Sequence, residues 1–351
     1  MPASTLKLLT AAAALEHLPH DLTFSTKILA DSDLRGGRLA NLYLVGEADP
    51  ELSTHHLKDF ARELRDLGLR RVLKDIVVNP GPHAFPPYGS GWAWDDAGHS
   101  YSPEIGGLVL DGGEYPLSPL WSQVLPHAKP AGMWSIPGRG GLLVQGHAPL
   151  TAAPPCPSLR TGERLRAELK ELGVEVKGGV RLGSGGSFPL VEHTSRPLKS
   201  ILKKALAESD NLAMELIYRV NTQRLPSSLQ GAPLRAVDGS GLSRYNLLSA
   251  QQLVTLLLEN RAHLEVLPSA GEGTLRMRFL QGTVAGQIRA KTGTLSSVSS
   301  LAGYLFPDTD HECAFAILIN GHLGPASERK LLEERLVERW VEEIVRANIG
   351  D

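Results

Sequence analysis

The alternation of apolar and polar residues divides the first half of the chain into helices and strands. Residues 6–18 are strong helix formers, and apolar residues recur at helical spacing over 52–67 and 160–172, each followed by a glycine. Residues 41–45 and 75–78 are predicted strands. This order of strand, helix and strand predicts a small α/β unit outside the first helix.

Helical periodicity returns in the second half, after a Gly/Ser-rich hinge at 183–186. It covers 197–219 and 249–260, and an amphipathic helix over 327–347 closes the chain. Residues 113–157 contain many prolines and predict short strands and turns. The remaining predicted strands are residues 107–110, 174–182, 287–291, 299–306 and 313–320.

Composition narrows the class of protein. With 351 residues, 42% apolar and 21% charged, the chain is long enough for two or three globular domains. A net charge of -2 gives no reason to expect nucleic acid as a partner, and no stretch reaches the roughly 20 apolar residues of a transmembrane helix. Cys156 and Cys313 are far apart, lack metal-type spacing and are predicted to be unpaired; a catalytic cysteine or histidine is not favoured.

Three short motifs occur in a fixed order: Ser4-Thr5-Leu6-Lys7, Ser209-Asp210-Asn211 and Lys291-Thr292-Gly293. Each alone has a purely structural interpretation, as a helix cap with a solvated lysine, a helix N-cap and a turn respectively. Together, in this order, they are typical of serine acyl-transfer enzymes that react with β-lactams.

The chemistry accounts for the spacing. A serine hydroxyl is a weak nucleophile until a base takes its proton. At positions i and i+3 of a helix, Ser4 and Lys7 lie on one face, so that the amine can reach the hydroxyl. A helix N-terminus adds partial positive charge where an oxyanion forms. Burial and the nearby cation Lys291 would lower the pKa of Lys7 and favour the neutral base.

Longer segments around these motifs resemble the penicillin-binding D-alanyl-D-alanine carboxypeptidase/endopeptidase family, the DacB-like S13 peptidases. Residues 238–244, Asp-Gly-Ser-Gly-Leu-Ser-Arg, are a strong marker of this family. The other matching segments are residues 2–10, 91–96, 101–102, 207–213 and 289–295. The resemblance covers nearly the whole chain, including the long insertion between the first and second motifs.

The resemblance implies an α/β multi-domain fold. A transpeptidase-like catalytic domain, an antiparallel sheet with helices, would comprise residues 1–30 and 187–351. An inserted α/β domain would comprise 31–112 and 157–186, and a small nested β-rich domain 113–156.

The resemblance also implies roles for the motif residues. Ser4 would be the nucleophile and Lys7 the base, Ser209 would pass a proton to the leaving amine, Asn211 would hold the substrate amide, and Lys291 would supply positive charge. Gly293 belongs to the same motif, the hydroxyls of Thr292 and Thr294 would bind the terminal carboxylate, and the N–H groups of Ser4 and Thr294 would form the oxyanion hole. No metal or other cofactor is implied.

The most detailed expectation from the resemblance is a pocket for the amino-bearing side chain of the peptide. It would be shaped by Asp96, Tyr101, Arg244 and Leu295. The alternatives are structural: an aspartate that caps a turn, a tyrosine that packs, and an ion pair between Arg244 and Asp238.

The first 18 residues also resemble a secretory signal peptide. Cleavage there would remove Ser4 and leave the other motifs without purpose, so we interpret this segment as the catalytic helix. Family members carry a signal peptide and several strands before this helix, whereas this chain shows no signal peptide. We therefore expect a misassigned start codon or a trimmed chain, in which Ser4 would lie near a fraying end.

The sequence therefore predicts a serine D,D-carboxypeptidase, with D,D-endopeptidase activity as a second reaction. It would act on peptidoglycan stem peptides outside the cytoplasmic membrane and be acylated by β-lactams. The alternatives are a serine β-lactamase or esterase of the same fold, and an inactive cell-wall-binding protein.

Overall fold

The computed structural model describes residues 1–82, 86–97, 99–113 and 156–349. The predicted nested domain, 113–156, lies almost entirely outside these residues. The chain divides into two compact units: the first comprises 1–23, 89–93 and 196–351, and the second 24–88 and 94–195. The division falls seven to nine residues from the predicted domain limits, because two strands at these limits pair within the second unit.

The second unit is built on a five-stranded sheet in the order β7-β5-β3-β1-β8. Strands β3, β5 and β7 run parallel to one another, whereas β1 is antiparallel to both β3 and β8. The strands are β1 (Ser25–Ala30), β3 (Leu42–Gly46), β5 (Ile76–Asn79), β7 (Val180–Leu182) and β8 (Phe188–Thr194). A parallel three-stranded sheet joins β2 (Arg38–Leu39), β4 (Arg71–Val72) and β6 (Glu175–Val176).

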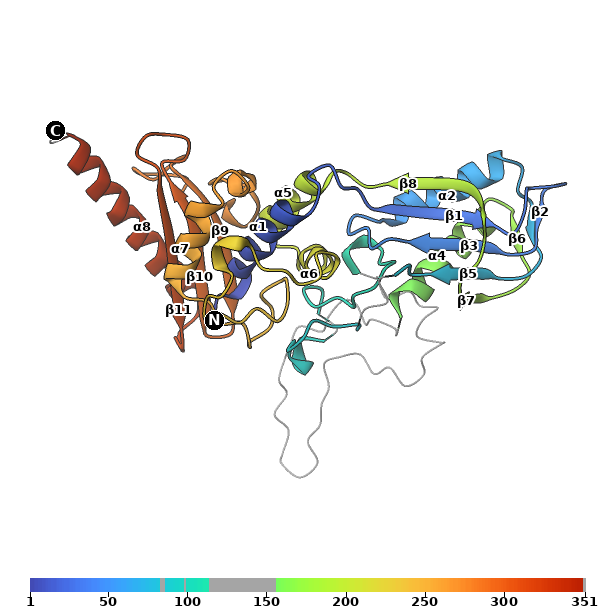
Figure 1. Ribbon diagram of the computed structural model, residues 1–351, viewed down its shortest axis with the longest axis horizontal. Helices are drawn as coiled ribbons and strands as arrows, with labels where there is room; N and C mark the ends of the chain where they lie inside the picture. The colour runs from blue at the N-terminus through green and yellow to red at the C-terminus, as the bar shows by residue number, and fades with distance from the viewer. Residues whose placement is uncertain (83–85, 98, 114–155, 350–351) are drawn as a thin grey trace, which may run out of the picture. The chain divides into compact units, whose positions relative to one another are not determined.

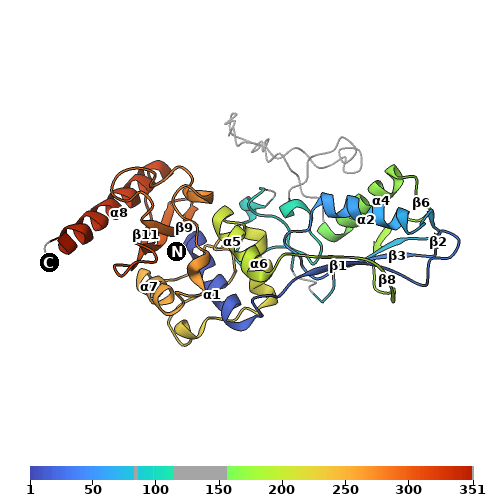
Figure 2. The same ribbon diagram turned by 90° about the horizontal axis from the view of Figure 1, so that it is seen from above.

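Helices α2 (Thr54–Asp66) and α4 (Pro157–Glu171) pack against each other and lie on the same side of the five-stranded sheet (Figure 2). Four of the five apolar positions that predicted α2, Leu57, Phe60, Ala61 and Leu64, are buried, whereas Leu67 just past its end is exposed. The four buried side chains join an aliphatic core with the side chains of β3 and β5. Burial of this stripe stabilises the unit by about 25 cal/mol per Å² of apolar surface removed from water.

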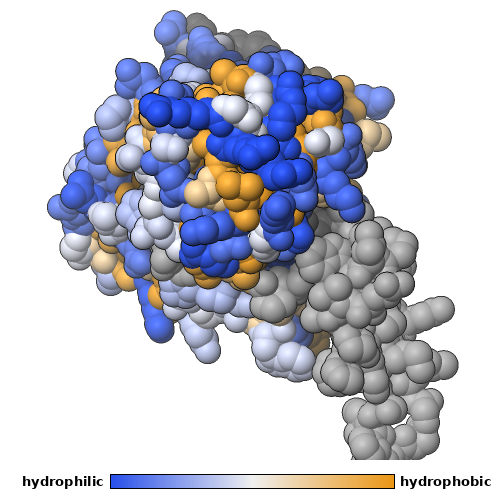
Figure 3. All heavy atoms as spheres, turned by 90° about the vertical axis from the view of Figure 1, so that its right-hand side faces the viewer, coloured by the Kyte–Doolittle hydropathy of each residue, from blue (hydrophilic) through white to orange (hydrophobic). Residues whose placement is uncertain are grey.

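Two predicted strands of the second unit differ from the structure. Residues 107–110 are buried but form no strand. Residues 174–182 form two short strands in different sheets, β6 and β7, because Gly178 and Gly179 interrupt the extended run. On the face drawn in Figure 3, patches of hydrophobic surface are separated by hydrophilic side chains.

The first unit contains an antiparallel sheet in the order β11-β10-β9. Its strands are β9 (Ile288–Leu295), β10 (Val298–Leu305) and β11 (Cys313–Asn320), and the helix α8 (Ala326–Ile349) follows. Every residue of β10 is buried, so both faces of this strand are covered. Ser299 faces α8, where its hydroxyl bonds to Glu333 at 2.6 Å, and Ser300 faces the opposite side, as the two-residue period of a strand requires.

Helices cover the face of this sheet opposite α8 (Figure 1). They are η1 (Ala3–Leu6), α1 (Lys7–His17), α5 (Leu198–Glu208), α6 (Asn211–Val220) and α7 (Ala250–Glu259). Helix α1 is buried from Lys7 to Leu15 and packs against α5, α6 and α7. The other short helices are η2 (Trp94–Asp96), η3 (Asp111–Gly113), η4 (Ser227–Leu229), η5 (Leu264–Val266) and η6 (Gly273–Leu275). Among the described residues no helix is both long and apolar enough to cross a membrane.

Candidate active site

The first motif forms a tight turn at the start of α1. Ser4 lies in the 3-10 turn η1 and Lys7 begins α1. Side chains three residues apart are eclipsed in a 3-10 helix, and Lys7 Nζ lies 3.0 Å from Ser4 Oγ. The predicted pairing of hydroxyl and amine is therefore present.

The turn is anchored to the sheet of the first unit. The carbonyl of Pro2 accepts hydrogen bonds from Ser300 Oγ of β10 at 2.6 Å and from Thr5 Oγ1 at 2.7 Å. Gly293 of β9 lies so close that a Cβ there would be 2.7 Å from the backbone nitrogen of Ser4. A glycine in the third motif is thus required by the close approach of two backbones.

The second motif joins two helices rather than lying within one. Ser209 ends α5 with φ +60°, a left-handed conformation that costs a non-glycine residue about 1 kcal/mol or more. Asp210 caps α6, accepting a hydrogen bond from Ala213 N at 2.9 Å, and Asn211 is its first residue. The predicted helix over 197–219 is interrupted here. The break turns the side chains of Ser209 and Asn211 to the two lysines.

Lys7 is fully buried and its amine meets three oxygens. Besides Ser4 Oγ, Nζ lies 2.6 Å from Asn211 Oδ1 and 2.5 Å from the carbonyl oxygen of Ser240. Burial lowers the pKa of Lys7 to about 8, although the carboxylates of Asp238, Asp210 and Glu215 act in the opposite direction. At pH 7, one unit below this pKa, about a tenth of the Lys7 amines are therefore neutral.

The three contacts determine what a neutral Lys7 can do. The Asn211 amide oxygen and the Ser240 carbonyl oxygen can only accept hydrogen bonds. A neutral amine has two N–H bonds, and these two oxygens occupy both. Its lone pair is then directed to the third partner, the hydroxyl of Ser4, which is the arrangement that a general base requires.

Lys291 is the second buried amine. Its Nζ donates to Ser209 Oγ at 2.9 Å and to the carbonyl of Thr292 at 2.8 Å. Burial, and then the charge of Lys7, hold the pKa of Lys291 well below its ordinary value. The two hydroxyls, Ser4 and Ser209, are therefore each paired with a lysine.

The third motif lies inside β9 rather than at the end of a strand, because the ladder with β10 continues to Leu295. Thr292 Oγ1 donates to Thr274 Oγ1 of η6 at 2.8 Å, and Thr294 is exposed. Thr274 was not among the predicted site residues. No local motif marks it, since it reaches Thr292 only through the packing of η6 against β9.

The predicted side-chain pocket is divided between the two units. Asp96 and Tyr101 belong to the second unit, where Tyr101 Oη donates to Asp96 Oδ1 at 3.0 Å. Arg244 and Leu295 belong to the first unit, and Arg244 is half-buried and makes no ion pair with Asp238. The role of these four residues in substrate binding stays a prediction.

No group of three or more His, Cys, Asp or Glu side chains within the described ranges could hold a metal ion. The site consists of a serine at a helix start, two buried lysines, a second serine and an asparagine. These features define the class of serine acyl-transfer enzymes in which a lysine activates the nucleophile.

Comparisons with known proteins identify the family. The sequence profile of the D-Ala-D-Ala carboxypeptidase 3 (S13) family matches residues 1–121 and 139–340. A D-alanyl-D-alanine carboxypeptidase from Actinomadura sp. (strain R39) is 33% identical, over 93% of this chain and 74% of that protein. The crystal structure of penicillin-binding protein 4 (DacB) from Haemophilus influenzae matches with a TM-score of 0.74 and 25% identity, over 93% of this chain and 86% of that one.

The chain therefore belongs to the D-Ala-D-Ala carboxypeptidase 3 (S13) family and is a serine-type D-Ala-D-Ala carboxypeptidase. The predicted fold class and activity are confirmed. A second Haemophilus influenzae structure, 24% identical with a TM-score of 0.68, contains a β-lactam.

Proposed function

We propose that Ser4 is the nucleophile of this carboxypeptidase and that Lys7 is its base. Ser4 Oγ attacks the carbonyl carbon of the penultimate D-alanine while Lys7 takes the hydroxyl proton. The peptide bond then breaks, an ester forms on Ser4, and the terminal D-alanine leaves as a free amino acid. Water hydrolyses the ester. The observation that carries this proposal is the 3.0 Å contact between Lys7 Nζ and Ser4 Oγ.

Ser209 and Lys291 are proposed to serve the leaving group. The nitrogen of the terminal D-alanine needs a proton when the peptide bond breaks. Ser209 Oγ, held 2.9 Å from Lys291 Nζ, can deliver this proton and be reprotonated by the lysine. Asn211 would bind the substrate amide, and Thr292 and Thr294 the terminal carboxylate.

The oxyanion is proposed to bind to the backbone N–H groups of Ser4 and Thr294. The short distance between the backbone of Ser4 and Gly293 supports this proposal, because it brings the two peptide segments side by side. Donors aimed at the developing charge stabilise the transition state without reorganising, and each contributes about 3 kcal/mol in serine peptidases.

The substrates are proposed to be the D-Ala-D-Ala ends of peptidoglycan stem peptides, with β-lactams as acylating inhibitors. The β-lactam complex of the Haemophilus influenzae protein supports the second part. From the substrate we infer that the protein works outside the cytoplasmic membrane. Labelling of intact cells by a fluorescent penicillin that cannot cross this membrane would support the location, and labelling only after lysis would contradict it.

Fluorescent penicillin and a D-Ala-D-Ala peptide together test the mechanism. The wild-type protein should be labelled stoichiometrically and should release D-alanine. Ser4→Ala should lose both, and Ser32→Ala, which changes an exposed serine of the second unit, should keep both. Labelling that persists in Ser4→Ala would refute the assignment. Rapid β-lactam turnover without release of D-alanine would favour the β-lactamase alternative.

A further inference from the structure

One contact of the proposed base Lys7 comes from a loop outside the three motifs. We call residues 236–246 the Asp238 loop. The carbonyl of Ser240 in this loop accepts a hydrogen bond from Lys7 Nζ at 2.5 Å. Gly241, with φ +82°, packs directly on the backbone carbonyl of Ala3, where a Cβ would collide. The loop is therefore fitted against the nucleophile turn, and its shape decides where one N–H of Lys7 points.

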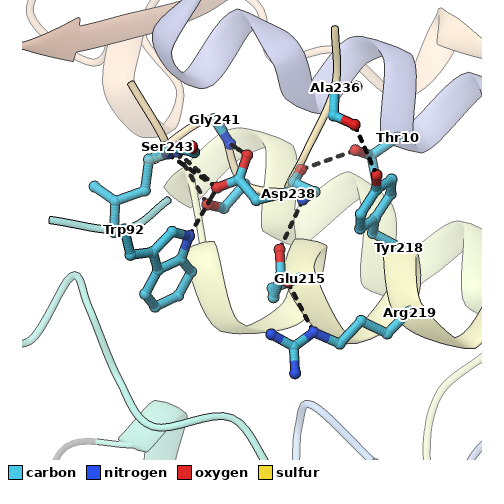
Figure 4. A network of polar contacts seen from close by, with 12 residues as sticks. Thr10, Trp92, Glu215, Tyr218, Arg219, Ala236, Asp238, Gly241 and Ser243 are labelled. Atoms are coloured by element: carbon cyan, nitrogen blue, oxygen red, sulfur yellow. Dashed lines mark hydrogen bonds and ion pairs between the residues drawn. The ribbon is translucent and has the colours of Figure 1, made fainter. Parts of the chain in front are cut away.

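Asp238 is the centre of this loop. Its side chain is fully buried and accepts six hydrogen bonds, most of them from the loop itself (Figure 4). The donors are Trp92 Nε1 at 2.8 Å, Ser240 Oγ at 2.7 Å, the backbone nitrogens of Gly241, Leu242 and Ser243 at 3.1 Å, and Asn246 Nδ2 at 2.7 Å. A buried carboxylate is tolerated only with such compensation.

Glu215 of α6 holds the other side of the loop by a hydrogen bond. Its carboxylate accepts a hydrogen bond from Gly239 N at 2.7 Å and pairs with Arg219 Nε at 2.8 Å (Figure 4). Thr10 Oγ1 donates to the Gly239 carbonyl at 2.8 Å, and Tyr218 Oη to the Ala236 carbonyl at 3.1 Å. The loop is thus tied to α1 and α6, which also carry Lys7 and Asn211.

We propose that Asp238 and Glu215 are positioning residues for the reaction. They hold the Asp238 loop so that the Ser240 carbonyl takes one N–H of Lys7 and leaves the lone pair of the amine directed at Ser4. They also supply the negative charge that sets the pH range in which this amine is a base. This inference rests on the proposed role of Lys7.

The charge around Lys7 fixes the expected sign. Asp238, Asp210 and Glu215 are the anionic groups that act on Lys7, and the charge of Lys7 in turn lowers the pKa of Lys291. Arg219 offsets part of the charge of Glu215. Because the three carboxylates raise the pKa of Lys7, removal of one lowers it, and the neutral base is then available at lower pH.

The pH profile of β-lactam acylation tests whether the negative charge of Glu215 acts on Lys7. Glu215→Gln keeps the shape of the side chain and an acceptor for Gly239. We expect the acidic limb of the second-order acylation rate to move to lower pH by about half a unit or more, as expected for a charge acting over several ångströms in a medium of effective dielectric about 20. The ¹³Cε resonance of Lys7, assigned by its absence in Lys7→Met, should titrate at the same lower pH.

Glu333→Gln is the matched control, because Glu333 is equally buried and also pairs with an arginine, Arg278 at 3.0 Å, but exerts no resolved effect on Lys7. The acidic limb should stay in place in this variant. An unmoved limb and an unmoved Lys7 resonance in Glu215→Gln would overturn the role of charge, even if the rate fell.

Trp92→Phe tests the positioning role without a change of charge. The loss of one donor to Asp238 should slow acylation several-fold and leave the acidic limb unchanged. A wild-type acylation rate in Trp92→Phe would overturn the positioning role. This test remains available if Glu215→Gln does not fold. Failure of the proposed function itself looks different, because wild-type protein would then show no acylation at all.

Discussion

The cores of the two units are built on different principles. Between the five-stranded sheet and helices α2 and α4, the second unit buries a continuous set of aliphatic side chains. Around α1, the first unit buries Lys7, Lys291, Glu215 and Asp238, each exposed by 2% or less. Aliphatic burial is the stabilising term of folding, whereas buried charge is costly unless it is paired. The first unit also has an apolar core between its sheet and α8, so the difference between the units lies in the charged groups that the first unit buries beside Ser4.

This difference predicts opposite responses to substitution. A change at a buried lysine should alter the reaction more than the fold, and a change in the aliphatic core should alter the fold more than the reaction. Three substitutions and one pH experiment, taken from the largest expected effect to the smallest, test or break this contrast.

Lys7→Met should give the largest effect. General-base catalysis contributes about 10²–10⁴-fold, and we expect the acylation rate to fall by this factor. Lys199→Met, which replaces a half-exposed lysine on α5, should acylate at the wild-type rate. Stopped-flow measurement with a chromogenic β-lactam gives both rates. A fall of less than tenfold in Lys7→Met would show that another group takes the proton of Ser4.

Leu44→Ala should show the opposite behaviour. Leu44 is fully buried in the second unit, and Leu→Ala changes at such sites cost about 3–5 kcal/mol of unfolding free energy. Leu67→Ala, at a side chain that is 55% exposed, should cost about 0.5 kcal/mol or less. Urea unfolding measures both. If the acylation rate of folded Leu44→Ala fell as well, the separation between the two cores would not hold.

The aliphatic core was the part that the sequence predicted well. The period of apolar residues placed α2 to within two residues at its start and one at its end, because burial of a stripe fixes the helix that carries it. The same rule failed at 107–110, where apolar residues are buried without a ladder. It also did not reveal β1 and β8, whose pairing joins segments more than 150 residues apart.

The site was predicted from its motifs, but the groups that tune it were not. The Ser4–Lys7 spacing and the burial of Lys7 followed from the chemistry of an activated serine, whereas the burial of Lys291 was not predicted. Ser240 lies in the segment 238–244 that marks the family, but its contact with Lys7 is made by a backbone carbonyl, which the residue types of the segment do not predict. Thr274 and Glu215 lie near the site only because the helices that carry them pack against it. Such tertiary contacts cannot be predicted from the local sequence pattern.

The pH dependence of stability measures the cost of burying Lys7. Its pKa of about 8 lies below the model-peptide value of 10.5. Well below pH 8 Lys7 is largely protonated in both the folded and the unfolded state, and the full cost is present. Between pH 8 and 10.5 the folded state has lost the proton while the unfolded state keeps it, so stability rises with pH.

The expected gain from Lys7 across this window is up to about 3 kcal/mol, since one pKa unit corresponds to about 1.4 kcal/mol. Urea unfolding at pH 7 and pH 10 measures it, and the difference between wild type and Lys7→Met isolates the contribution of Lys7. An equal pH dependence in both proteins would mean that Lys7 is not depressed in the folded state.

Thr274→Val should give the smallest effect. The change removes the hydroxyl that accepts the 2.8 Å hydrogen bond from Thr292 but nearly keeps the side-chain volume. A neutral hydrogen bond contributes about 1 kcal/mol, so we expect KM for a D-Ala-D-Ala peptide to rise a few-fold with kcat nearly unchanged. Thr274→Ser should restore KM, because it returns the hydroxyl. If kcat fell and KM did not change, Thr274 would act on the transition state. Helix η6 would then belong to the part of the first unit that serves the reaction.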